Sequence, residues 1–248
     1  MIVIGKNAVL EILKSTPKDI NKIIFMRTLK PEKRLKEIVL IAKDNGIALQ
    51  SLSKFDFAKY FNRKNKDEGI SQGVVGFMKE FEYTILRDLL NSIKEIKNPL
   101  IIVLDEVTEP HNLGAIIRSA VCLGADGIVI PRHNSAEINH TVFKTSSGAA
   151  KLIPVCKETN ISNSILYLKQ NGFTAVGADA KTKSLLYEVD FKRPIALVLG
   201  SEGYGLREGI TENCDELVRI PMAGKIDSLN VSVSAGVFLY EIFRQKQI

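Results

Sequence analysis

The chain has 248 residues, of which 45% are hydrophobic and 25% are charged, and its formal net charge at pH 7 is +6. These proportions are typical of a globular protein, and the length suits two modest domains or one large one. No apolar run approaches the roughly 18 residues of a membrane-spanning helix, and the first residues have no basic leader of the kind that a signal peptide carries. We therefore expect a cytoplasmic protein.

The first part of the chain has the apolar patterns of short elements that alternate in type. This part ends at Asn98-Pro99, because the residue before a proline disfavours helix. The segment before this break, residues 79–97, has the pattern of a charged amphipathic connector. In chain order, the patterns predict a helix over 6–14, a strand over 22–26, a helix over 31–44, a strand over 47–51, a helix over 54–61 and a strand over 73–78.

Beyond the break, the apolar runs are continuous. Strands that are covered on both faces have such runs, and their alternation with helical stretches indicates a parallel sheet. We therefore predict an α/β fold with a parallel sheet for this part. The predicted strands are LIIVLD (100–105), GIVIP (127–131), KLIPV (151–155), FTAVGA (173–178), PIALVLG (194–200) and ELVRIP (216–221).

The whole basic excess lies in the first part of the chain. Residues 1–97 hold 19 lysines and arginines against 12 acidic residues. Two stretches concentrate the charge, 27–37 and 59–66, and the second has Tyr60 and Phe61 among its cations. Such patches attract phosphate backbones, and exposed aromatic rings can stack on unpaired bases, although a solvated lysine-rich face has the same composition.

The three cysteines, Cys122, Cys156 and Cys214, lie far apart in apolar surroundings. Their odd number and their spacing indicate buried thiols of a reducing compartment rather than a disulfide framework. The three histidines have no ligand-like spacing with them, so we expect no metal site.

Ligands of open α/β sheets bind at the carboxyl ends of strands, and three unusual stretches fall there. In the first, residues 104–131, Asn112 is a plausible N-cap for a helix. Arg118 lies opposite the apolar stripe of that helix, and an arginine on a face of small residues can be approached closely by a bulky ligand, although it can also be an ordinary surface arginine. The stripe itself consists of Leu113, Ile116, Ile117, Ala120 and Leu123, and the small residues beside Arg118 are Gly114, Ala115, Ser119 and Cys122.

The second stretch, residues 197–208, runs from a strand into three glycines that surround Glu202. Glycines permit a tight turn and let backbone groups approach a ligand. The spacing is neither that of a dinucleotide-binding fingerprint nor that of a P-loop, and a plain glycine-rich turn is the alternative. The glycines are Gly200, Gly203 and Gly205.

The third stretch, residues 219–245, contains a strand, a loop and a final helix. Ser228 is expected to cap that helix, which leaves Leu229 and Asn230 in its first turn, where backbone N–H groups are free. The helix is apolar on nearly every side, so we expect it to be buried or to lie in a subunit interface. A buried carboxamide without partners costs about 1–3 kcal/mol, so Asn230 should face a site, although it can also cap a neighbouring loop.

Together, these stretches closely resemble the SpoU/TrmH-type ribose 2′-O-methyltransferases of the SPOUT superfamily. The third family motif is matched by IPM followed by SLNVS. The first domain is similar, through IGKNAVLEIL and GISQGVVGF, to the small ribosomal-protein-like (L30e-like) domain of many members. The first motif is matched by Asn112, Gly114 and Arg118 in HNLGAIIRSA, and the second by Gly200, Glu202 and Gly203 in GSEG.

The resemblance implies a domain order and a substrate. Residues 1–78 are expected to form an RNA substrate-binding domain, 79–98 a linker, and 99–248 a SPOUT methyltransferase domain with a deep trefoil knot. Members use S-adenosylmethionine and are generally homodimers, with each active site close to the subunit interface. The chain looks most like the subgroup that methylates a guanosine ribose in 23S rRNA, as part of rRNA processing, although Ser71 stands where that subgroup commonly has histidine.

The resemblance also implies roles for single residues. Arg118 is the residue that the family places against the RNA. A guanidinium does not readily lose a proton, so our hypothesis is that Arg118 grips a phosphate and stabilises the developing alkoxide. Asn112, Glu202, Ser228 and Asn230 are expected to position the ribose, the nucleotide or Arg118. The side chains of Arg118, Glu202 and Asn230 are expected to converge beside the methyl donor. The residues expected to bind the cofactor are Gly200, Ile220, Met222 and Leu229.

Other functions remain open at this point. A tRNA ribose methyltransferase is the main competitor, and a different rRNA site, of the antibiotic-resistance type, is also compatible with the motifs. A non-catalytic RNA-binding module would bind RNA but not S-adenosylmethionine. A dinucleotide-dependent oxidoreductase is disfavoured because its fingerprint is missing.

Overall fold

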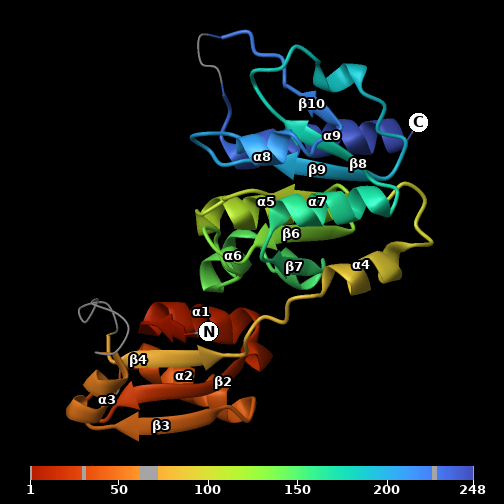
Figure 1. Cartoon of the computed structure of the whole chain (residues 1–248). Coiled ribbons are helices and arrows are strands. Elements are labelled where there is room, and N and C mark those ends of the chain that lie inside the picture. The colour runs from red at the N-terminus through yellow and green to blue at the C-terminus, as the bar shows by residue number, and fades with distance from the viewer. Residues whose placement is uncertain (1, 30–31, 62–71, 225–227, 248) are drawn as a thin grey trace. The chain divides into compact units, whose positions relative to one another are not determined.

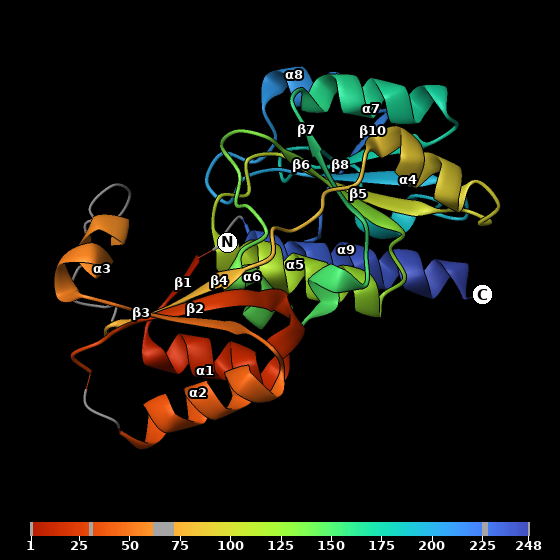
Figure 2. The same ribbon diagram turned by 90° about the horizontal axis from the view of Figure 1, so that it is seen from below.

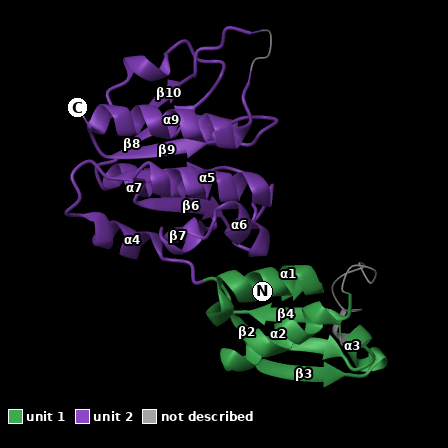
Figure 3. Cartoon of the chain, turned by 180° about the vertical axis from the view of Figure 1, so that it is seen from behind, with its two compact units in different colours: residues 1–81 green, residues 82–248 purple. Residues whose placement is uncertain are grey.

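The computed structural model describes residues 2–29, 32–61, 72–224 and 228–247. The chain divides into two compact units, Met1–Phe81 and Glu82–Ile248 (Figure 3). Ser71, at the position where the subgroup commonly has histidine, lies outside the described residues, as do the side chains of Tyr60 and Phe61. No helix in the described ranges is long and apolar enough to cross a membrane.

The first unit is a four-stranded sheet with the strand order β1-β4-β2-β3. Strands β2 and β3 pair in parallel, and the other two pairs are antiparallel. Within the described residues, the predicted helices and strands of this unit are present to within two residues, although the predicted helix start at residue 31 lies outside them. Among the described strands and α-helices of the unit, the pattern missed β1, which is three residues long. The elements are β1 (Ile2–Ile4), α1 (Lys6–Ser15), β2 (Ile20–Met26), α2 (Lys33–Asp44), β3 (Ala48–Leu52), α3 (Lys54–Phe61) and β4 (Val74–Met78).

The second unit contains a six-stranded sheet with the order β10-β8-β9-β5-β6-β7, in which every pair is parallel. The prediction of an α/β fold with a parallel sheet is confirmed. The strands are β5 (Leu100–Leu104), β6 (Gly127–Pro131), β7 (Val155–Glu158), β8 (Thr174–Ala178), β9 (Ile195–Leu199) and β10 (Glu216–Val218).

Helices cover both faces of this sheet, which explains why its central strands are apolar throughout (Figures 1 and 2). Helices α4, α7 and α8 lie on one face, and α5 and α9 lie on the other, where they pack against each other. Strands β5, β6 and β9 are buried at every position. The helices are α4 (Leu86–Ile93), α5 (Pro110–Cys122), α6 (His140–Thr145), α7 (Ile161–Gln170), α8 (Glu208–Thr211) and α9 (Val231–Lys246).

The segment 79–98 differs from the linker that we expected. Its central part is helix α4, which belongs to the second unit and packs on the sheet with the residues of its apolar stripe. Thr84 also joins that unit, because its backbone N–H donates to the carbonyl of Val155. The stripe of α4 consists of Leu86, Leu89, Leu90 and Ile93, all buried.

The strand predicted over 151–155 begins only at its last residue, Val155. Residues 149–151 form a turn of 3-10 helix, and Pro154 has no N–H group to donate to a sheet ladder. The apolar run therefore marks a buried segment correctly but places the strand too early.

The order of the strands determines where a ligand can bind. From β5 the chain proceeds outward to β6 and β7, and it then returns to β8, on the far side of β9. The connections on the two sides of the β9–β5 pair therefore run in opposite directions, and the crevice at the carboxyl ends of such strands is the usual ligand site of open α/β sheets. Leu104 and Leu199 are paired there, and Asp105 follows at once.

Candidate active site

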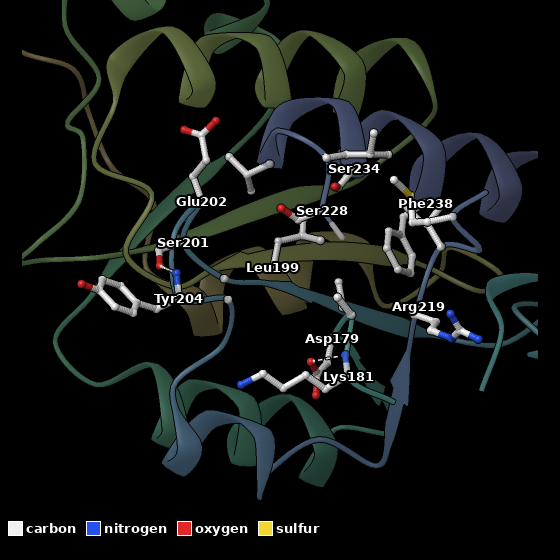
Figure 4. Close-up of a pocket in the computed structure, with 18 of the residues that line it drawn as sticks. Asp179, Lys181, Leu199, Ser201, Glu202, Tyr204, Arg219, Ser228, Ser234 and Phe238 are labelled. Atoms are coloured by element: carbon white, nitrogen blue, oxygen red, sulfur yellow. Dashed lines mark hydrogen bonds between the residues drawn. The ribbon is translucent and has the colours of Figure 1, made fainter. Parts of the chain in front are cut away.

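A cavity of about 650 Å³ lies at the carboxyl ends of β8, β9 and β10 (Figure 4). Its walls are residues 178–181, residues 199–205, part of the segment 218–224 and the start of α9. All four residues expected to bind the cofactor line this cavity, and so does Ser228. The four are Gly200, Ile220, Met222 and Leu229.

The loop after β9 is closed by its own backbone. The N–H of Ser201 donates to the carbonyl of Gly205 at 3.0 Å, and the N–H of Gly205 donates back to Ser201 at 3.1 Å. Gly205 has a positive φ of 71°, which L side chains rarely adopt. A Cβ atom on Gly200 would lie 2.1 Å from the carbonyl of Gly205. Glycine is therefore required at positions 200 and 205, because the loop folds tightly onto itself.

Three polar side chains from distant segments meet beside this loop. The carboxamide of Asn112 donates to Oε2 of Glu202 at 3.0 Å. The carboxamide of Asn230 donates to Oε1 of Glu202 at 2.5 Å and to Oδ1 of Asn112 at 3.1 Å. Both carboxylate oxygens of Glu202 are thus held, and Glu202 itself lines the cavity.

Asn230 performs two tasks at once. Its Oδ1 accepts hydrogen bonds from the backbone N–H of Ser232 at 2.9 Å and of Val233 at 3.4 Å, so Asn230 is the N-cap of α9. The expected N-cap, Ser228, was wrong, because the helix begins at Val231 and Ser228 lies two residues before its cap. The side-chain oxygen of Asn230, Oδ1, accepts hydrogen bonds from the helix backbone. Its side-chain nitrogen, Nδ2, donates to Glu202 and Asn112.

The expected role of Asn112 as an N-cap was also wrong. The N-cap of α5 is Glu109, whose side chain accepts from the N–H of His111, and Pro110 occupies the first helical position. Asn112 lies in the first turn of the helix, and its side chain is free to reach Glu202.

The expected convergence of Arg118 with Glu202 and Asn230 is not found within one copy of the chain, because Arg118 lies outside this cluster. It is exposed on α5, it does not line the cavity, and among the described residues it has no hydrogen-bond or ion-pair partner. The face of small residues around it is less open than we expected, because a Cβ atom on Gly114 would lie 1.7 Å from Oγ1 of Thr145, on α6. Cys122, expected to be buried, is exposed on the same helix.

The sequence patterns did not single out one pair that holds the loop. Asp105 is fully buried at the end of β5, and Arg207 binds both of its carboxylate oxygens. The Nε–Oδ2 distance is 3.0 Å and the Nη2–Oδ1 distance is 2.5 Å. This hydrogen bonding raises the pKa of Arg207 above its ordinary value. The sequence feature that could have identified Asp105 is an acidic residue immediately after a fully apolar strand.

Two protein-family models match this chain, and together they cover most of it. A family model described as the SpoU rRNA Methylase family matches residues 99–240, and one described as RNA 2′-O ribose methyltransferase substrate binding matches residues 2–84. The chain belongs to the SpoU rRNA methylase family. It is therefore an RNA ribose 2′-O-methyltransferase, and its methyl donor is S-adenosylmethionine.

Relatives extend over nearly the whole length of this SpoU methylase. It is 41% identical to YacO of Bacillus subtilis, named as a TrmH family tRNA/rRNA methyltransferase, over 98% of this chain and 95% of that protein. It is 35% identical to the 23S rRNA (guanosine-2′-O-)-methyltransferase RlmB of Pectobacterium atrosepticum, over 99% of this chain and 98% of the other.

Solved structures share its fold. The SpoU methyltransferase AviRb of Streptomyces viridochromogenes, crystallised with AdoMet, has a TM-score of 0.66 at 22% identity and covers 100% of this chain and 90% of that one. The TrmH/SpoU tRNA modifying enzyme of A. aeolicus has a TM-score of 0.57 at 32% identity and covers 65% of this chain and 82% of its own.

The cavity of this SpoU methylase fits its cofactor. Its volume lies within the range of about 300–1,000 Å³ that small-molecule sites have. The apolar residues Leu199, Val218 and Phe238 are part of its wall, and so is Arg219, whose buried Nε has no partner among the described residues. When bound, S-adenosylmethionine supplies a methyl group that the positive charge on its sulfur activates.

Proposed function

We propose that this SpoU methylase transfers a methyl group to the ribose 2′-hydroxyl of a guanosine in 23S rRNA. The observation that supports a reaction at this place is the convergence of Asn112, Glu202 and Asn230 at the edge of the cofactor cavity. The substrate rests on the likeness to RlmB, which extends over 99% of this chain and includes its first unit.

The protein's task in this reaction is alignment. A ribose hydroxyl is a weak nucleophile, so its oxygen, the methyl carbon and the sulfur must lie in line at roughly 3–3.5 Å between the reacting atoms. Glu202, held by two carboxamides in one orientation, is suited to accept a hydrogen bond from the ribose. Ser228, in the wall of the cavity, is suited to orient the same nucleotide.

We infer that Arg118 acts at the cavity of a second copy of the chain. Helix α9 has a stripe of exposed apolar residues, which no described residue of its own unit covers: Val233, Val237 and Tyr240. Such a stripe on an otherwise packed helix indicates an interface. We infer a homodimer through this stripe, in which Arg118 of one copy grips a phosphate of RNA bound at the other copy's cavity. Arg118 does not line the described cavity of its own chain.

Mixed dimers test the role of Arg118. Arg118→Ala and Glu202→Gln are each expected to be inactive alone. If Arg118 acts in the other copy's site, remixing the two variants gives dimers with one intact site, and the mixture recovers about a quarter of wild-type activity. A mixture that stays inactive while mass spectrometry of the intact dimers shows mixed dimers would contradict action across the interface.

Three further features belong to the same proposal. We infer that the segments around the cavity form the deep trefoil knot of the SPOUT superfamily, because the motifs that carry it are present. We also infer that the first unit has the L30e-like fold and binds the RNA substrate, which its basic excess supports. The cytoplasm is the expected location, since the substrate is found there.

Mapping the 2′-O-methylated riboses in cellular RNA tests which RNA is the substrate. RNA from cells that lack the protein should miss one 2′-O-methylguanosine in 23S rRNA, and the purified protein with S-adenosylmethionine should restore it. A missing mark in tRNA, with 23S rRNA unchanged, would overturn the rRNA substrate and establish the tRNA alternative.

A further inference from the structure

The loop after β9 presents one aromatic ring to solvent. Tyr204 is 93% exposed, more than any other large hydrophobic residue in the described part of the chain. A single exposed aromatic side chain is ordinary on a protein surface. The position of Tyr204 and the way its backbone is held therefore decide whether it has a role.

The backbone holds Tyr204 firmly. It lies inside the turn closed by Ser201 and Gly205, and its own N–H donates to Oγ of Ser201 at 3.4 Å. Figure 4 shows the ring directed away from Leu199 and Phe238, which form the apolar part of the cavity. The turn thus fixes the backbone of Tyr204, and its ring lies in the wall of the cavity and points outward, away from the apolar part.

Tyr204 is close to the reacting position along the chain. Tyr204 follows Glu202 by two residues, so their Cα atoms are at most about 7 Å apart. This is the scale of the spacing between one nucleotide and the next. A ribose held at Glu202 would bring the base of an adjacent nucleotide within reach of the ring.

A cation lines the same mouth. Lys181, after β8, is exposed, lines the cavity with Tyr204, and has no ion-pair partner among the described residues. In Figure 4 it extends toward the same side as Tyr204. An aromatic ring and an unpaired ammonium group in the wall of one described cavity match the two general features of an unpaired nucleotide, a base that stacks and a phosphate that is anionic.

We propose that Tyr204 and Lys181 form a subsite for the unpaired nucleotide next to the methylated one. The ring of Tyr204 stacks on its base, and Lys181 binds its phosphate. The subsite rests on the proposed function, because it requires an RNA ribose at Glu202. It makes the enzyme select a target in a loop or bulge over one inside a continuous duplex.

The chain contains no tryptophan, so Tyr204→Trp introduces a unique fluorescent reporter at the subsite. The probe is an unmethylated 23S rRNA transcript that contains the mapped target. Stacking is expected to quench the fluorescence, and a transcript with an abasic nucleotide beside the target should not quench it. Equal quenching by both transcripts would overturn the assignment of the stacked base.

Activity assays supply the second arm. A base stacked on an aromatic ring contributes an amount that corresponds to about 5- to 150-fold in binding. Tyr204→Ala should therefore raise KM for the transcript within that range and leave the Kd for S-adenosylmethionine unchanged, whereas Tyr204→Phe should behave as wild type. Tyr187→Ala is the matched control, since Tyr187 is 59% exposed on the same unit but does not line the cavity.

The salt dependence of RNA binding tests Lys181. One lost phosphate contact lowers the slope of log K against log salt by about 0.7 for single strands. Lys181→Gln should show this change, and Lys183→Gln, at an exposed neighbouring position outside the cavity, should not. An unchanged KM in Tyr204→Ala and an unchanged slope in Lys181→Gln, in an enzyme that still methylates the transcript, would overturn the subsite alone. A wild-type enzyme that methylates no rRNA would instead overturn the proposed function.

Discussion

Arg207 binds both carboxylate oxygens of Asp105, a fully buried residue that precedes it by 102 positions. The backbone N–H of Asp105 donates in turn to the carbonyl of Leu199, the last residue of β9. The pair therefore joins the end of β5 to the far end of the glycine-rich loop that contains Glu202. The loop is held at both of its ends, at Leu199 and at Arg207. These contacts help to keep Glu202 in position against the two carboxamides.

Replacing Asp105 with asparagine should loosen this loop. Asparagine keeps the shape but removes the charge that Arg207 binds. The loss of unfolding free energy should be about 1–2 kcal/mol, less than for a fully buried ion pair, because Arg207 is half exposed. The affinity for S-adenosylmethionine should fall about 5- to 30-fold, as calorimetry can measure. Lys14→Gln, which breaks an exposed ion pair with Glu37, is the control and should change stability by under about 1 kcal/mol.

Gly200 should not tolerate a methyl group. Its Cβ atom would lie 2.1 Å from the backbone of Gly205, and backbone cannot yield as the end of a side chain can. Gly200→Ala should therefore cost about 1–3 kcal/mol of stability and abolish measurable cofactor binding. Gly209→Ala has open space at its Cβ and lies in helix α8, so it should keep or slightly raise the melting temperature. Equal cofactor affinity in both variants would show that the loop is not tightly closed.

Asn230→Asp separates the two tasks of Asn230. Aspartate keeps the capping oxygen but replaces the donor to Glu202 with a second carboxylate. Methyl transfer should fall more than about 10-fold at pH 7, and the melting temperature should be lower than that of wild type. This deficit should shrink as pH falls, because protonation of either carboxylate removes the repulsion.

The matched control for this variant is Asn160→Asp, at the N-cap of α7, where the side chain accepts from the N–H of Asn163 and does not contact the cluster. It should retain full activity. Wild-type activity in Asn230→Asp would show that donation to Glu202 is not needed.

The fold and the polar cluster could be predicted from the sequence to different extents. The parallel sheet followed from continuous apolar runs. The resemblance predicted that Arg118, Glu202 and Asn230 converge. Glu202 and Asn230 do meet, together with Asn112, but Arg118 lies outside their cluster. The helix starts were misplaced because several residues near Ser228 and Asn112 have capping chemistry, and the tertiary contacts decide between them. Asp105 was not singled out, because its partner lies across the sheet and no local pattern records that contact.

The thiols give a prediction about pH. Burial raises the pKa of both Cys156 and Cys214 to about 12. The folded protein therefore keeps protons that the unfolded chain releases above about pH 9, and this contribution to stability is lost as pH rises from 9 toward 12. Wild type should lose up to about 1.4 kcal/mol per pH unit relative to Cys156→Ser in denaturant titrations between pH 9 and 11. At pH 8, iodoacetamide should modify the exposed Cys122 first, and early modification of Cys156 would contradict this account.

The position of the transferred methyl group tests the central claim most directly. The purified enzyme is incubated with methyl-labelled S-adenosylmethionine and an unmethylated 23S rRNA transcript, and the RNA is then digested to nucleosides. We predict label in 2′-O-methylguanosine, and a loss of more than about 100-fold in Asn112→Ala and Glu202→Gln proteins that still bind the cofactor. Label on a base, or full ribose methylation by both variants, would contradict a reaction at the meeting point of these side chains.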